Sequence, residues 1–160
     1  ADQTGTEVKR FLALMVLAGC TAATPPAPSK PVPFRNPTVL VASQSDVTLA
    51  RLNGDWRVVS IFEDAQFGAV RRVSFTPDAM RVNGTAFPIA SLKEGRLIAG
   101  GQPFWVHWLD INNRTAVIGS PDGKYGWIMD RTGTPSADRL KAAREILDWY
   151  GYDLSRMKDV

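Results

Sequence analysis

The sequence predicts a mainly β fold, a small antiparallel barrel or sandwich, with one α-helix near the C-terminus. Between residues 56 and 130, apolar and β-branched residues alternate with polar residues over many short stretches. Turn-forming residues separate these stretches at regular spacing. One stretch with helical periodicity follows them and ends before Gly151.

Eight stretches are expected to form strands: residues 56–62, 70–75, 79–82, 85–89, 97–99, 104–109, 115–119 and 125–130. Turn signals such as Asn83-Gly84 and Gly100-Gly101 lie between them. In the expected helix, Thr134 is the predicted N-cap and Pro135 the first helical residue. An apolar stripe follows the helical period at Leu140, Ala143, Leu147 and Tyr150.

The N-terminus has the pattern of an export signal. Lys9 and Arg10 precede an apolar run from Phe11 to Leu17, which is too short to span a bilayer as a helix. The tetrad Leu17-Ala18-Gly19-Cys20 resembles the lipobox of bacterial lipoproteins, whose cysteine carries the lipid. This resemblance predicts a signal peptide over residues 1–19 and lipidation of Cys20. A buried core cysteine is the alternative.

Residues 20–48 are expected to form the lipidated cysteine and a tether, because six prolines lie between Pro25 and Pro37. We expect residues 1 to about 45 to contribute nothing to folding. Residues 49–160 then form the barrel domain, which is long enough for one core.

The residue inventory does not favour an enzyme. Cys20 is the only cysteine and His107 the only histidine, so neither a disulfide nor a familiar catalytic triad can form within one chain. No metal site or cofactor is predicted. His107 is expected to be a wall residue, and Asp110, Asp122 and Asp130 to bond the backbone at strand ends. The net charge of +3 is modest and scattered, which argues against nucleic-acid binding.

Aromatic and apolar residues gather on one face of three strands, where they either fill a core or line a pocket. Trp56, Val58 and Ser60 share one face of their strand. The candidate walls of a ligand pocket are Val58, Phe104, Val106, Trp108, Tyr125, Trp127 and Met129.

Several motifs together resemble bacterial lipocalins. Gly54-Asp55-Trp56 matches the G-x-W motif that opens their first strand, and Trp127-Ile128 with Arg131 matches W-I-x-x-R. The helix and Gly151-Tyr152-Asp153 complete the pattern over about 55 residues. The resemblance implies a lipocalin-like antiparallel barrel with the helix packed outside. It also implies that Trp56 closes one end of the barrel and that Arg131 stacks over it.

The chain departs from the lipocalin pattern between Glu63 and Phe104, where it has fewer residues than a full lipocalin. Strands there must be shorter, or a hairpin must be missing.

Two functional hypotheses follow, and an enzyme acting on lipids is a weaker third. In the first, the protein is an outer-membrane lipoprotein facing the periplasm that binds a small apolar ligand, such as a fatty acid or lysophospholipid. In the second, side chains fill the barrel, which acts through its surface as an envelope interaction module or protease inhibitor. Small periplasmic protease inhibitors also resemble lipocalins, but they generally carry a disulfide and lack the long helix.

Overall fold

A computed structural model describes residues 32–160 of the chain. The predicted signal peptide and the predicted lipidation site Cys20 lie outside the described residues. Pro31–Val160 forms one compact unit.

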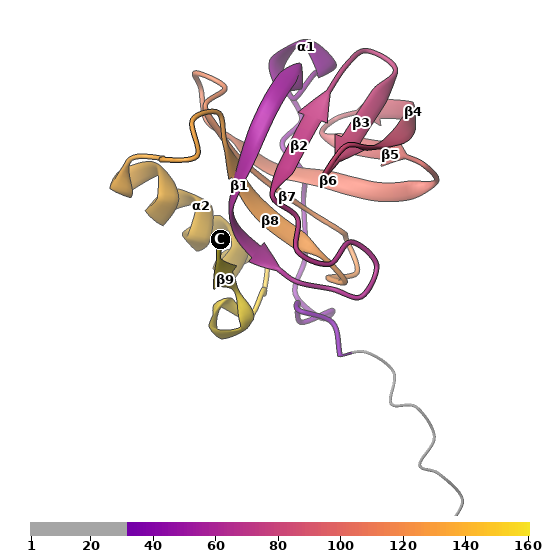
Figure 1. The fold of residues 1–160 in the computed structure, drawn as a ribbon. Helices are drawn as coiled ribbons and strands as arrows, with labels where there is room; N and C mark the ends of the chain where they lie inside the picture. Colours follow the sequence, from indigo (N-terminus) through magenta and orange to yellow (C-terminus); the bar gives the residue numbers. More distant parts are fainter. Residues whose placement is uncertain (1–31) are drawn as a thin grey trace, which may run out of the picture. The chain divides into compact units, whose positions relative to one another are not determined.

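Eight antiparallel strands close into a barrel (Figure 1). The strands follow each other around the barrel in chain order, and β1 closes it by pairing with both β8 and β2. Their bounds are β1 Gly54–Phe62, β2 Arg72–Phe75, β3 Ala79–Val82, β4 Thr85–Lys93, β5 Arg96–Ala99, β6 Gln102–Leu109, β7 Thr115–Gly119 and β8 Gly126–Asp130. A short ninth strand, β9 Lys158–Asp159, pairs with the end of β1. The predicted barrel is confirmed.

The shortened region between Glu63 and Phe104 keeps all of its hairpins. Strands β2, β3 and β5 have only four residues each, and each pairs with both of its neighbours, with one register shift between β4 and β5. The sequence left open whether strands are shorter or a hairpin is missing, and the structure shows shorter strands.

Helix α2, Ala137–Trp149, packs outside the barrel (Figure 1). Its buried residues Ala143 and Leu147 join Val117 and Ile128 in an outer apolar cluster. Every residue of β7 and β8 is therefore buried, since the barrel interior covers one face and much of the other lies under α2 and the segments beside it. The helix begins two residues later than predicted, and Ser136 is its N-cap. The predicted cap, Thr134, lies in the preceding turn, where its backbone N–H donates to the Thr132 hydroxyl.

The barrel has three register shifts of the β-bulge kind, and two of them change which of the predicted residues face the interior. One lies between Val58 and Ser60 in β1 and the other between Val106 and Trp108 in β6. After a bulge, the next residue in the alternation points to the opposite face. Ser60 therefore points outward to Asp159, at 2.6 Å, and Ile61 takes the interior position.

The second bulge corrects a predicted site residue. Trp108 packs against the outer cluster beneath α2, and Leu109 joins the interior cluster in its place. Strict alternation along β6 would place Trp108 inside, but His107 is the extra residue of the bulge. The prediction that Trp108 lines the barrel interior is wrong.

Residues 32–48, which we call the strap, pack on the outside of the barrel. Arg35 is only 4% exposed, and it donates to the backbone oxygens of Tyr150 at 2.9 Å and Pro121 at 3.0 Å. Gln44 bonds β6 twice, once from its backbone N–H to the Val106 oxygen and once through its side-chain oxygen to the Leu109 N–H. The extended tether predicted for residues 20–48 therefore does not run through residues 32–48. The expectation that residues 1 to about 45 contribute nothing to folding stays a prediction, and these contacts argue against it for residues 32–45.

A one-turn helix, α1 Leu49–Leu52, joins the strap to β1 and lies over one end of the barrel (Figure 1). Thr48 caps it, and Leu52 is fully buried. We call this end of the barrel the closed end. We call the opposite end, where the loop of residues 63–71 connects β1 to β2, the mouth.

Candidate functional site

The barrel interior holds six of the seven predicted wall residues. They are at most 6% exposed and belong to one buried apolar cluster: Val58, Phe104, Val106, Tyr125, Trp127 and Met129. Alternation on β1, β6 and β8 brings them together, since each strand points every second residue inward until a bulge intervenes. Whether they line a ligand site depends on what fills the space between them.

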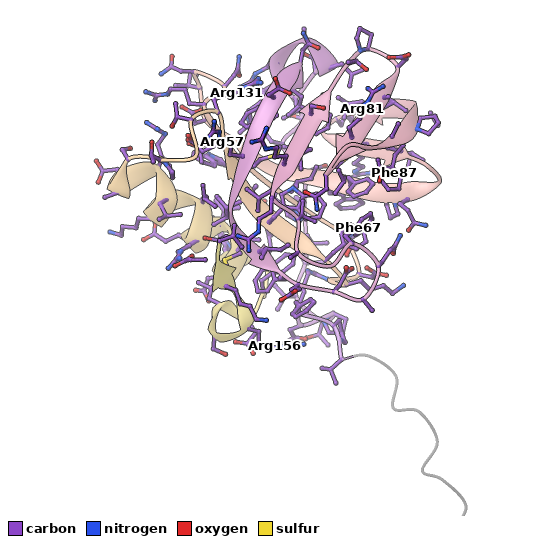
Figure 2. All side chains as sticks on the ribbon, viewed as in Figure 1. Arg57, Phe67, Arg81, Phe87, Arg131 and Arg156 are labelled. Carbon is purple, nitrogen blue, oxygen red and sulfur yellow. The ribbon has the colours of Figure 1, made fainter. Side chains whose placement is uncertain are left out.

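Phe67 occupies the mouth of the barrel. It belongs to the loop between β1 and β2 and packs with Phe87, a strand residue of β4; both are labelled in Figure 2. Its ring centroid lies 4.9 Å from that of Tyr125, 5.6 Å from Phe104 and 6.0 Å from Trp127. These are normal aromatic contact distances. A loop side chain thus fills the centre of an aromatic cluster that the strands provide.

Sequence reasoning missed Phe67. The loop Glu63–Ala69 is otherwise mostly polar or small, and a lone aromatic between Gln66 and Gly68 was the available signal. Asp64 fixes the turn by accepting hydrogen bonds from the backbone N–H groups of Gln66 and Phe67.

The two polar aromatic groups of the interior differ in their hydrogen bonding. The Tyr125 hydroxyl donates to the backbone oxygen of Pro103 at 2.7 Å, and burial raises the pKa of Tyr125. The Trp127 indole N–H is fully buried and has no acceptor among the described residues. An unpaired buried donor is costly and is usually satisfied by water or a ligand. Trp127 therefore offers one polar contact inside an apolar space.

Four hollows on the surface of the described residues have volumes of about 300 to 410 Å³. None of the four is lined by Phe104, Tyr125 or Trp127. The space beside these three rings is occupied by Phe67 instead.

The closed end is fixed by Trp56 and Arg131. The Arg131 guanidinium carbon lies 3.7 Å from the centroid of the Trp56 ring, which is the contact implied by the resemblance. The Trp56 indole N–H donates to the Leu52 oxygen at 2.8 Å. Arg131 donates to four backbone oxygens, those of Arg51, Asn53, Asp55 and Asn113. Burial lowers the pKa of Arg131, with Asp55 opposing the shift.

His107 holds the strap to the barrel wall. Its Nδ1 lies 2.7 Å from the Ala42 oxygen and its Nε2 lies 3.0 Å from the Tyr152 hydroxyl. Because a carbonyl only accepts, Nδ1 carries the proton in the neutral ring. Burial lowers the pKa of His107 to about 4.

The acidic residues near strand ends have structural roles. Asp130 accepts hydrogen bonds from Thr115 and Thr132 and lies 3.5 Å from Arg139. Burial alone would raise its pKa, but these partners outweigh burial and the pKa is lowered. Asp110 accepts from the backbone N–H groups of Arg114 and Thr115. The prediction that these carboxylates bond the backbone is confirmed.

Among residues 32–160, no group of three or more His, Cys, Asp or Glu side chains is placed to hold a metal ion. Within the same residues, no helix has the length and apolar character needed to cross a membrane.

A closed antiparallel barrel with an apolar interior and an external C-terminal helix defines the class of protein. The family model described as "Lipocalin-like domain" matches residues 77–160, more than half of the chain. The protein therefore belongs to the lipocalin-like family. No curated protein sequence matches the chain at a significant level.

Solved lipocalin structures share the fold. The allergen Per a 4 from cockroaches is similar over 76% of this chain and 92% of its own, with a TM-score of 0.55 and 15% identity. The bovine lipocalin allergen Bos d 2 is similar over 71% of this chain and 94% of its own, with a TM-score of 0.50 and 10% identity. At these identities the likeness concerns the fold alone.

Proposed function

We propose that this protein binds a small apolar ligand inside the barrel, in the place that Phe67 occupies. The observation that carries the proposal is the position of Phe67: a half-buried loop side chain sits among three buried aromatic residues, Phe104, Tyr125 and Trp127. A ligand that displaces Phe67 gains contact with these rings. Its affinity would come from buried apolar area, at roughly 25 cal/mol per Å².

Trp127 limits the chemistry of the ligand. Its N–H has no acceptor among the described residues, so a ligand carrying one carbonyl or carboxylate oxygen beside its apolar part would satisfy it. A fatty acid or a lysophospholipid has this combination of groups. A pure hydrocarbon would leave the donor unpaired and should bind more weakly.

We also propose that lipidated Cys20 holds the protein at the outer membrane, facing the periplasm. The lipobox-like tetrad and the export pattern support this. Phe34 packs on Phe62 with ring centroids 5.2 Å apart, and Phe62 ends β1 just before the loop that carries Phe67. The described chain therefore begins beside the mouth of the barrel.

Ligand binding is tested with Phe67→Ala in a full chain that also carries Cys20→Ser. Removing the ring opens the site, so a fatty acid should bind about tenfold or more tightly than it does with Phe67 present, as read from a saturable change in tryptophan emission. Trp149→Ala is the matched control, because this aromatic residue is 77% exposed on α2. Trp127→Phe should remove most of the emission change. Equal affinity with and without Phe67 would contradict the proposal.

Anchoring is tested by fractionation of cells. The wild-type chain should sediment with the membrane, and Cys20→Ser should release it into the periplasmic fraction. Unchanged membrane association of Cys20→Ser would contradict lipidation.

The second candidate is a filled barrel that acts through its surface. It is favoured by the four hollows, none of which involves Phe104, Tyr125 or Trp127. Absence of saturable fatty acid binding by a folded Phe67→Ala variant would favour this candidate.

A further inference from the structure

Three arginines project from the outside of the barrel on adjacent strands. Arg57 on β1 and Arg72 on β2 are direct partners in the antiparallel register. Arg81 on β3 pairs with Ser74 and lies on the diagonal from Arg72, within reach of long side chains. All three are exposed. Like charges directly opposite each other destabilise a strand pair, so this arrangement has a cost that a structural role would not explain.

These three arginines lack the partners that most other arginines among residues 32–160 have. Arg51, Arg114, Arg139 and Arg144 form ion pairs with aspartates. Arg96 and Arg156 lie over aromatic rings. Among residues 32–160, the side chains of Arg57, Arg72 and Arg81 have no hydrogen bond, ion pair or aromatic partner. Arg71 shares this lack, but it does not line the hollow described next. The charge of Arg81 contributes to lowering the pKa of Asp78.

These side chains surround a hollow of about 380 Å³ on the outer face of β1 to β3. Arg131 and the edge of Trp56 form its wall at the closed end, and Ser74 lies on its floor. Asp55 is the one acidic residue that lines it. Figure 2 shows Arg57, Arg81 and Arg131 beside these strands. With four arginines and one aspartate, the lining carries a formal charge of +3.

Local contacts hold parts of this hollow in place. The stem of Arg57 lies against Gly133, where an added Cβ would come within 2.9 Å of the Arg57 Cδ. The side-chain oxygen of Asn83 accepts from the backbone N–H of Arg72 at 3.1 Å, which ties the start of β2 to the β3–β4 turn. Arg131 is held by its four backbone acceptors. Because these groups are held before binding, a ligand would lose less free energy in ordering them.

We propose that this hollow, the arginine groove, binds a soluble phosphate-bearing small molecule, either a phosphate ester or a diphosphate. The planar guanidinium donates two parallel hydrogen bonds to phosphate oxygens, and three such groups without partners suit one or two phosphate groups. The volume fits a molecule of that size. A bilayer would present a flat array of headgroups, whereas these arginines line a recess. The groove lies outside the barrel, so this site is independent of a ligand in the interior.

The test is calorimetric titration of the full chain carrying Cys20→Ser with inorganic pyrophosphate and with glycerol phosphate. We expect saturable binding that weakens as salt concentration rises. Arg72→Gln and Arg81→Gln should each weaken binding about tenfold or more, since each removes a charged hydrogen-bond donor. Arg96→Gln is the matched control, because it removes the same charge from an outward position on β5 that does not line the groove.

A second readout separates binding from folding. Arg72 and Arg81 are exposed, so neither variant should lower the thermal midpoint of the parent chain, and Arg72→Gln should raise it slightly by removing the like charge opposite Arg57. Pyrophosphate should raise the midpoint of the parent but not of the variants. Absence of saturable binding by the parent would overturn the proposal. An equal loss of affinity in Arg96→Gln would also overturn it, because the phosphates would then be attracted by the net charge of the protein and not by the groove. A third outcome would also overturn the proposal. If the parent binds vesicles containing phosphatidylglycerol but neither soluble phosphate, and the two groove variants lose vesicle binding, the surface binds a membrane instead.

Discussion

The two ends of the barrel are closed by different kinds of interaction. At the closed end, Arg131 covers Trp56 and is itself held by four backbone oxygens, so directional hydrogen bonds fix the cover. At the mouth, the backbone N–H of Phe67 donates to Asp64, but the Phe67 side chain is held by ring contacts, which are not directional in the same way. A cover held by hydrogen bonds must break them to move, whereas an apolar ring can exchange with another apolar group at little net cost. We therefore expect the Arg131 cover to stay in place at the closed end, and we expect Phe67 at the mouth to be the group that a ligand could displace.

The largest expected effect concerns the closed end. Trp56→Ala should lower the free energy of unfolding by about 3 to 5 kcal/mol, because it removes a large buried ring and leaves Arg131 over a cavity. Arg131→Ala should lower the free energy of unfolding by more than the removal of an ordinary surface charge does. Chemical denaturation of both single variants and the double variant measures their coupling, expected to be about 0.5 to 3 kcal/mol. Additive losses would show that the cover and the indole act separately.

The next effect concerns the wall between the two ends, where His107 lies. Its pKa in the folded protein is about 4, below the ordinary value of 6.5, so the unfolded chain takes up a proton first as pH falls. The free energy of unfolding should therefore decrease between pH 6.5 and about 4, by at most about 3 kcal/mol, and no further from this group at lower pH. Because the chain has one histidine, His107→Gln should flatten the profile in this range. An unchanged slope in that variant would exclude His107 as the cause.

The smallest effect is expected at the mouth. Phe67→Ala should lower the free energy of unfolding by about 1 kcal/mol, since the ring is half-buried and its loop can readjust. Phe104→Ala, which removes a fully buried strand residue from the same cluster, should cost about 3 to 5 kcal/mol. Denaturant midpoints of the two variants measure the contrast. Equal losses would mean that Phe67 is as integral to the core as Phe104 and would weaken the distinction between the ends.

The sequence predicted the features of this fold that depend on local periodicity. Alternation located all eight barrel strands, and the apolar stripe located α2. Alternation also identified Phe104, Tyr125 and Trp127 as neighbours inside the barrel. It failed at Trp108, because a bulge adds one residue to a strand without any mark in the pattern.

The missed features depend on contacts between distant parts of the chain. Proline content favoured an extended tether, but Arg35 finds backbone oxygens 86 and 115 residues away, which composition cannot reveal. Phe67 is one aromatic residue in a polar loop, and only the closed barrel places it against Trp127. The arginines of the groove are far apart in the sequence, and the register of β1 to β3 brings them together.

The strap has a consequence for the order in which this protein is completed. Phe34, Arg35 and Asn36 bond to the backbone of Asp153, Tyr150 and Gly151, which follow them by at least 115 residues in the sequence. The strap is therefore made before its partners, and it cannot dock until synthesis has passed them. The barrel wall at His107 gains its Tyr152 partner at the same stage. A deletion of residues 151–160 should therefore leave the strap undocked, although the two segments are far apart in the sequence.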